Sequence, residues 1–219
     1  MNRKLTPLLV AGALLAAVPG LAPVQAAPQA AAANAAQSSP SKLVLENSER
    51  ILSTLETRRA EFQKNPAALR QFVSSEFNNM FDRDYAARQV LGRHGRGASD
   101  ADIQAFGDAL ADNLMQRYGS SLLNFNTQLR VRVKSETPLP RGLGVKVASE
   151  MLRSDGDAIP VDYLMRQSGG QWKVFDVMVE GVSFVQTFRQ QFDQELQNKS
   201  IAQVAAELRK GQINANAEQ

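Results

Sequence analysis

The side chains that most often perform covalent chemistry are scarce in this chain. Its 219 residues include one histidine, His94, and no cysteine. This composition excludes thiol nucleophiles, zinc sites built from Cys and His, and any metal motif that needs two His ligands. A Ser-His-Asp triad would have to use His94, yet the chain has no G-x-S-x-G elbow to present a serine. We therefore interpret His94 as an ordinary loop residue.

Carboxylates are the remaining candidates for acid–base chemistry. Asp176 stands out among them, because it lies between Val174 and Met178 on an apolar side of a predicted strand. A carboxylate in such surroundings must be paired or protonated. Two roles fit this position: the general acid of a hydrolase, or a structural partner of an arginine or of backbone amides. We favour the structural role and keep the hydrolase as an alternative.

The loop Gly92–Gly97 is dense in glycine and arginine, as phosphate-binding loops are. It lacks the Lys-Ser/Thr ending of a Walker sequence and the G-x-G-x-x-G order of a dinucleotide fingerprint. We therefore interpret this loop as a connector between two helices.

The element that most constrains the fold is a predicted β-hairpin over 161–179. Two runs rich in β-branched and aromatic residues flank the short turn Ser168-Gly169-Gly170. Side chains alternate along the second strand, and both faces are apolar: Trp172, Val174 and Met178 on one, Phe175, Val177 and Val179 on the other. Such a strand needs protein layers on both sides, or protein on one side and an apolar ligand on the other.

Helical periodicity surrounds the strands. After Gly181, apolar residues recur every four positions and predict a helix with one phenylalanine stripe: Phe184, Phe188, Phe192 and Leu196. Further helices are predicted over 42–64, 66–80, 84–91, 99–125 and 200–210. Strands at 127–134 and 145–152 complete a four-stranded antiparallel meander with the hairpin. The sequence predicts one α+β domain over 42–210, followed by a flexible tail at 211–219.

The first 26 residues have the pattern of a secretory signal peptide. A basic start at Arg3 and Lys4 precedes an apolar run over 8–18, and Val24-Gln25-Ala26 offers a cleavage site. The apolar run is short for a transmembrane span, and no cysteine follows the cleavage site to carry a lipid anchor. Residues 27–41 are mostly Ala, Gln, Asn, Ser and Pro, a composition typical of a disordered linker.

Charge and cysteine content narrow the class of partner and the compartment. Of the 25 basic residues, two leave with the signal peptide, so 23 remain against 22 acidic ones, a formal charge of +1. A nearly neutral exported protein is a poor candidate for nucleic-acid binding. A fold without disulfides must be stabilised by its core, which favours the periplasm.

Several short motifs, in a fixed order, resemble the MlaC family. They are Val161-Asp162-Tyr163, the run 172–177, Glu180-Gly181-Val182-Ser183, the run 87–92, and Ala98-Ser99. The likeness extends over roughly residues 42 to 210. The resemblance implies a periplasmic phospholipid carrier that moves lipids between an inner-membrane ABC transporter and an outer-membrane lipoprotein and porin complex. It also implies maintenance of outer-membrane lipid asymmetry, without catalysis, cofactor or metal.

A carrier of this kind requires an apolar cavity enclosed by the sheet and the helices. From facing and position, we predict that eleven residues line it: Phe81, Leu110, Leu114, Tyr163, Met165, Trp172, Val174, Val177, Val182, Phe184 and Phe188. Ordinary core packing is the alternative for each of them. At the level of function, the alternatives are a periplasmic hydrolase that uses Asp176 and a protein-binding adaptor or chaperone.

Overall fold

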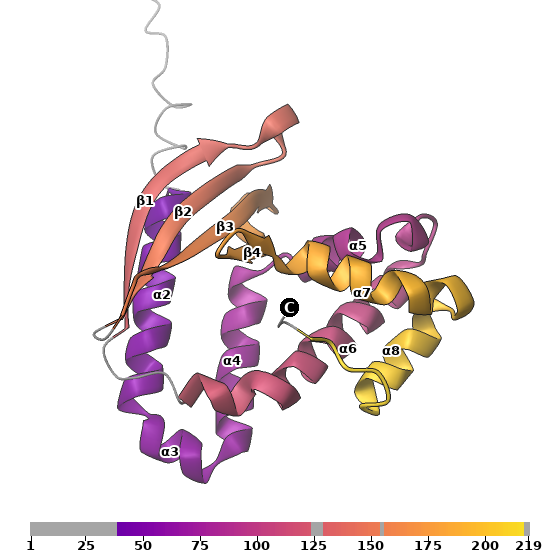
Figure 1. Ribbon diagram of the computed structural model, residues 1–219, viewed down its shortest axis with the longest axis horizontal. Helices are drawn as coiled ribbons and strands as arrows, with labels where there is room; N and C mark the ends of the chain where they lie inside the picture. The colour runs from indigo at the N-terminus through magenta and orange to yellow at the C-terminus, as the bar shows by residue number, and fades with distance from the viewer. Residues whose placement is uncertain (1–38, 124–128, 154–155, 217–219) are drawn as a thin grey trace, which may run out of the picture. The chain divides into compact units, whose positions relative to one another are not determined.

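The structure is a computed structural model that describes residues 39–123, 129–153 and 156–216 (Figure 1). The predicted signal peptide and residues 27–38 of the predicted linker lie outside the described residues. Helices come first in the chain, an antiparallel sheet follows, and helices end it. The predicted α+β class is therefore confirmed.

The elements keep the labels of Figure 1. Before the sheet lie α2 (Pro40–Thr57), α3 (Arg59–Lys64), α4 (Pro66–Met80), α5 (Arg83–Leu91), the 3₁₀ turn η1 (Gly92–Gly95), α6 (Asp100–Tyr118) and the 3₁₀ turn η2 (Gly119–Leu123). The strands are β1 (Arg130–Pro138), β2 (Val145–Leu152), β3 (Ile159–Ser168), β4 (Gln171–Val179) and β5 (Val182–Ser183), with the turn η3 (Pro140–Gly142) between β1 and β2. The chain then forms α7 (Phe184–Asn198) and α8 (Ile201–Arg209).

Side-chain caps fix where the helices begin. Asn65 accepts a hydrogen bond from the Ala68 amide at the start of α4, and Ser99 accepts one from the Asp102 amide at the start of α6. Both caps were predicted. The helix predicted over 42–64 is instead two helices, because Arg58 leaves helical geometry with φ −101° and ψ 14°. Helix α2 also begins at Pro40, so the last residues of the predicted linker are helical.

The sheet is antiparallel in the order β1-β2-β3-β4-β5. Four of these strands were predicted, and the fifth is the two-residue β5, which pairs with the end of β4. Glu180 and Gly181 both have positive φ, 52° and 84°, and turn the chain back on itself between β4 and β5. Ser183 then caps α7, so the sheet leads directly into the phenylalanine-striped helix.

A β-bulge in β4 decides which side chains share a face of the sheet. Leu164 pairs with Asp176 and Met165 pairs with Val174, which leaves Phe175 as the extra residue. Alternation restarts at the bulge. Val174 and Val177 consequently lie on one face and Asp176 on the other. The predicted grouping of Val174 with Asp176, opposite Val177, is therefore wrong.

Helix α2 covers the face that carries Val174 (Figure 1). Val44 of α2 packs there against a buried cluster from three strands, Val147, Met165 and Val174. The second core cluster lies among α5, α6, α7 and α8, where the ring of Phe106 meets that of Phe192 edge-on at 5.4 Å between centroids. Phe188, Phe192 and Leu196 of the predicted stripe are buried in this second cluster.

The end of the chain is docked, in contrast to the predicted flexible tail, at least up to Asn216. Asn113 of α6 is only 2% exposed, and its amide nitrogen donates to the carbonyls of Leu208 and Ile213 at 2.9 and 3.2 Å. Its carbonyl oxygen accepts from the Ala215 amide at 2.9 Å, and Ala215 is itself fully buried. A buried amide must be hydrogen-bonded, and the tail supplies the partners.

Candidate functional site

An apolar cavity of about 430 Å³ lies among α4, α5, α6 with η2, β4 and α7. The volume falls within the range of roughly 300–1,000 Å³ that is usual for ligand sites. Six aromatic side chains contribute to its walls: Phe77, Phe81, Tyr118, Phe175, Phe184 and Phe188. Such a lining offers apolar contact and few hydrogen-bonding partners, so it suits a hydrocarbon ligand.

Small residues on two neighbouring helices leave the space that the aromatic rings enclose. Ala86 and Ala87 of α5 and Gly107 and Ala111 of α6 line the cavity. A Cβ at Gly107 would lie 3.3 Å from the Cβ of Ala87, so the two helices approach closely at this point. The close contact between α5 and α6 therefore forms part of the cavity wall and leaves the space itself open.

The junction between α4 and α5 brings the helical wall to the sheet. Phe81 pairs with Val174 in an isolated parallel bridge, and the Asp82 amide donates to the Val174 carbonyl at 2.8 Å. The Phe81 ring stacks on Phe77, with 4.1 Å between centroids, and both rings face the cavity. The next residue of β4, Phe175, is the bulged one, and it too lines the cavity.

Six of the eleven predicted residues line this cavity: Phe81, Leu110, Leu114, Val177, Phe184 and Phe188. They come from four separate elements, α4–α5, α6, β4 and α7. The fold brings them together because α7 follows directly after the β4–β5 turn and packs against α5.

Four other predicted residues pack in the buried cluster of the sheet and α2: Tyr163, Met165, Trp172 and Val174. They pack in the cluster covered by α2, so they do not form part of the cavity lining. The physical reason is position along the sheet: the strands contribute only Phe175 and Val177 to the described lining, whereas these four residues lie on β3 or before the bulge in β4. The fifth, Val182, is 39% exposed on β5. Its placement in the lining is corrected as well.

Sequence reasoning missed most of the wall contributed by α4. Val73 and Phe77 line the cavity, as do Met115 and Leu122 near the end of α6 and in η2. All four lie on apolar stripes that a helical period reveals. The stripe shows that a residue is turned away from water, but it does not show which layer it meets.

Asp176 lies on the β4 face that receives the start of α7. It is 6% exposed, accepts from the Ser183 hydroxyl at 2.5 Å, and accepts from the Val185 amide at 3.0 Å. Burial raises the pKa of this carboxyl, and the hydrogen bonds from Ser183 and the backbone oppose the rise. The cavity lining does not include it. The structural role preferred from the sequence, with backbone amides among its partners, is the one that the geometry supports.

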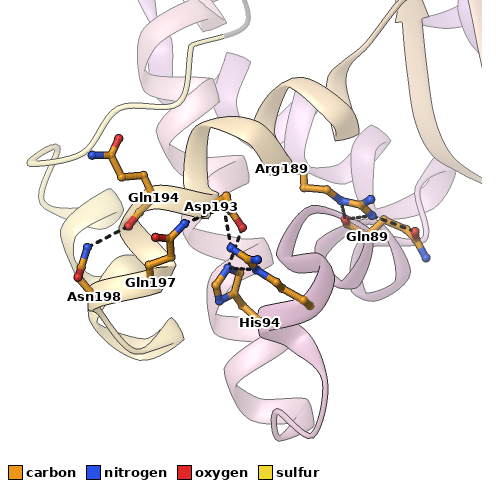
Figure 2. Close-up of polar contacts among 8 residues, drawn as sticks. Gln89, His94, Arg189, Asp193, Gln194, Gln197 and Asn198 are labelled. Carbon is orange, nitrogen blue, oxygen red and sulfur yellow. Dashed lines mark hydrogen bonds and ion pairs between the residues drawn. The ribbon is translucent and has the colours of Figure 1, made fainter.

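The Gly92–Gly97 segment fastens two of the cavity's helices to each other (Figure 2). His94 Nε2 lies 2.9 Å from Asp193 Oδ1 of α7, and Arg93 donates to the other oxygen at 2.9 Å. The hydrogen bond from His94 is the main cause that lowers the pKa of Asp193. Arg189 of α7 donates to the Gln89 carbonyl near the end of α5. The segment is a connector, as predicted, and His94 is occupied in holding α5 to α7.

The sequence model of the family described as MlaC protein matches residues 45–210. This chain belongs to the MlaC family. The toluene tolerance protein ttg2D of Pseudomonas putida is 27% identical over 165 residues, which are 74% of this chain and 75% of the relative. The intermembrane phospholipid transport system binding protein MlaC of Haemophilus influenzae is 23% identical over 154 residues, 69% of this chain and 72% of the relative.

A solved structure shares the fold of this MlaC-family chain. It is that of the phospholipid-binding protein from Ralstonia solanacearum in complex with a phospholipid, with a TM-score of 0.70 and 20% sequence identity. The match covers 80% of this chain and 98% of that one. Within the described ranges, none of this chain's helices combines the length and apolar character that crossing a membrane requires.

Polar residues mark where the cavity of this MlaC-family protein meets solvent. Ser74 and Asn78 of α4 and Asp112 of α6 line the cavity and are also exposed. Arg83, the first residue of α5, lines it too and is half-buried. The site therefore has an apolar interior and a polar mouth, the arrangement that an amphipathic ligand needs.

Proposed function

We propose that this protein binds a phospholipid and carries it through water, with acyl chain in the cavity and headgroup at the mouth. The observation that carries the proposal is the apolar space of about 430 Å³ with polar residues only at its opening. The Haemophilus relative, a phospholipid transport system binding protein, and the Ralstonia phospholipid-binding protein support the same class of ligand.

The energetics of lipid transfer explain why a carrier needs such a space. An exposed methylene costs about 0.8 kcal/mol, so two chains of ~15 methylenes each would cost ~24 kcal/mol to leave in water. An unassisted phospholipid therefore leaves a bilayer for water extremely slowly. A cavity lined by Phe, Leu and Val replaces the bilayer as an apolar solvent, which makes the transfer nearly neutral and reversible without a covalent step.

The route that we propose runs through the periplasm. The protein would receive or deliver lipid at an ABC transporter of the inner membrane and at a lipoprotein and porin complex of the outer membrane, and so maintain outer-membrane lipid asymmetry. The signal-peptide pattern of residues 1–26 supports export, and the family membership supports the transport system.

We assign contact with the acyl chains to the six predicted residues that border the cavity. Phe81, Phe184 and Phe188 offer aromatic rings for this contact, and Leu110, Leu114 and Val177 offer aliphatic side chains. Because this contact is apolar and non-directional, it discriminates poorly between chains of different length or saturation.

The proposal is tested by what the protein holds and moves. Protein purified from the periplasm without detergent is extracted with organic solvent, and the extract is analysed by mass spectrometry. Delipidated protein is then mixed with vesicles of phosphatidylglycerol that contain a pyrene-labelled phospholipid, and protein and vesicles are separated by size. We expect a phospholipid in the extract and label on the protein. Protein that holds no lipid in either experiment would refute the proposal.

A further inference from the structure

The mouth of the cavity contains a single positive charge among the residues that the structure describes there. Arg83 is the only basic residue of the described lining, and Asp112 is the only acidic one. The side chain of Arg83 is 34% exposed, so its guanidinium reaches water while its stem borders the apolar space. An amphipathic ligand seated in this cavity would bring its polar group to the same place.

Arg83 is held in this position by an ion pair across the two helices. Its Nη2 lies 2.7 Å from Asp108 Oδ1 of α6, and the Asp108 side chain is 44% exposed. The close approach of α5 and α6 at Gly107, one residue before Asp108, sets the distance that the pair spans. An ion pair this exposed contributes little to stability, so Arg83 can change partners at small cost.

We propose that Arg83 is the headgroup contact of this protein, and that its guanidinium exchanges Asp108 for the phosphate of a bound phospholipid. The inference rests on the proposed function and specifies the ligand's polar end. Guanidinium binds phosphate through two parallel hydrogen bonds, a geometry that one carboxylate oxygen at 2.7 Å does not use fully. Asp108 Oδ1 is covered while it is paired, but the side chain as a whole is 44% exposed, so its carboxylate can be hydrated once the guanidinium leaves.

The acidic neighbours make the exchange selective. Asp108 and Asp112 lie four residues apart, on the same side of α6. Without Arg83 the mouth would present the Asp112 carboxylate, with the Asp108 carboxylate one helical turn away, and would repel a phosphate. The Arg83 guanidinium can neutralise one anion at a time. In the lipid-free protein that anion is Asp108, which therefore competes with other anions for the guanidinium. A neutral lipid with the same acyl chains has no anionic group that could replace Asp108 at the guanidinium.

The test compares a charged and a neutral lipid in one mixture. Vesicles contain phosphatidylglycerol and diacylglycerol with identical pyrene-labelled chains, and the ratio of the two lipids on the protein is measured after separation. We expect Arg83→Gln to lower the ratio of phosphatidylglycerol to diacylglycerol about tenfold relative to the unchanged protein. Asp108→Asn, which removes the competing anion, should raise it. Both changes in the lipid ratio should become smaller as salt is added, because salt screens charges that are exposed to solvent.

A matched control separates this role from general effects of charge. Arg88→Gln removes another α5 arginine that pairs with an α6 aspartate, Asp100, but that lies outside the lining. Its ratio should equal that of the unchanged protein. An equal loss of both lipids in Arg83→Gln, or an unchanged ratio in both mouth variants, would overturn the inference while leaving the carrier intact. Unchanged protein that takes up neither lipid would instead refute the proposed function. If Arg83→Gln does not fold, the Asp108→Asn result decides.

Discussion

Filling the cavity with a protein side chain should abolish lipid binding without harming the fold. Ala111 is suited to this, because its side chain lines the cavity from α6 and is only partly buried. An indole ring at this position would extend into a space of about 430 Å³ that no described side chain fills. We expect Ala111→Trp to exclude part of an acyl chain from the site.

The magnitude follows from the apolar area that the ring takes from the ligand. A buried aromatic side chain covers roughly 150–250 Å². If about 100 Å² of that replaces contact with the acyl chain, the lost burial at ~25 cal/mol per Å² is ~2.5 kcal/mol. That free energy corresponds to a dissociation constant raised on the order of fifty- to a hundredfold. The melting temperature of the lipid-free protein should stay constant or rise, because the ring fills apolar space.

The assay measures equilibrium uptake of pyrene-labelled phosphatidylglycerol by delipidated protein, together with thermal unfolding of the same samples. Ala101→Trp is the matched control, because Ala101 lies in the first turn of α6, is exposed and is outside the lining. It should bind lipid as the unchanged protein does. Unweakened binding by Ala111→Trp would show that the acyl chain lies elsewhere. A large fall in its melting temperature would show that the space is not available, and either result would refute the reasoning.

Three further changes test other parts of the structure. Tryptophan at Val174, which is 1% exposed in the packed cluster under α2, should lower the unfolding free energy by at least about 1–3 kcal/mol. Urea denaturation would measure this cost, and no cost would contradict the placement of Val174. Asn113→Ala removes three hydrogen bonds to the end of the chain, two buried and one partly buried, and should cost about 3 kcal/mol, with Gln116→Ala on the exposed side of α6 as control. The same denaturation measures it, and equal stabilities for the two variants would contradict the docking of the tail. Because burial raises the pKa of Asp176 in the folded state, the stabilisation from its bound proton is present below the ordinary pKa of 3.8 and is lost as pH rises through the folded value. Unfolding free energies measured across this pH window should therefore fall relative to Asp176→Asn as pH rises, and parallel pH profiles would contradict the assignment.

Local signals in the sequence predicted the elements well. The bounds of β2 over 145–152, the caps at Asn65 and Ser99, and the stripe on α7 all agree with the structure. Each of these depends on neighbours within about one or two helical turns or on strand alternation, which a sequence displays directly. The α+β class followed from the order of these elements.

The cavity lining depended on contacts that a sequence does not display. We predicted both Val174 and Val177 in the lining, from opposite faces of β4, but the bulge at Phe175 puts both on the face towards α2, and only Val177 borders the cavity. A bulge is set by the pairing of two strands and leaves no clear mark in either one. Likewise, Asn113 bonds to Ile213 and Ala215, which lie 100 and 102 residues further along the chain, so the docked tail could not be inferred from its polar composition.

The arrangement of the core explains how a hollow can persist in a stable domain. At roughly 24 cal/mol per Å³, an empty apolar cavity of about 430 Å³ would cost up to about 10 kcal/mol, and less where water enters its mouth. This is comparable with the whole stability of an ordinary domain, about 5–15 kcal/mol. The walls therefore have to be stabilised separately, and they are: Leu110 and Phe188 belong to the helical cluster, Phe81 and Val177 pack on the cluster under α2, and Met115 packs on a third. A bound acyl chain would join these clusters as a missing part of the core. Tight binding and ready release are then opposed, and the exposed ion pair at the mouth is a point where an acceptor could shift that balance.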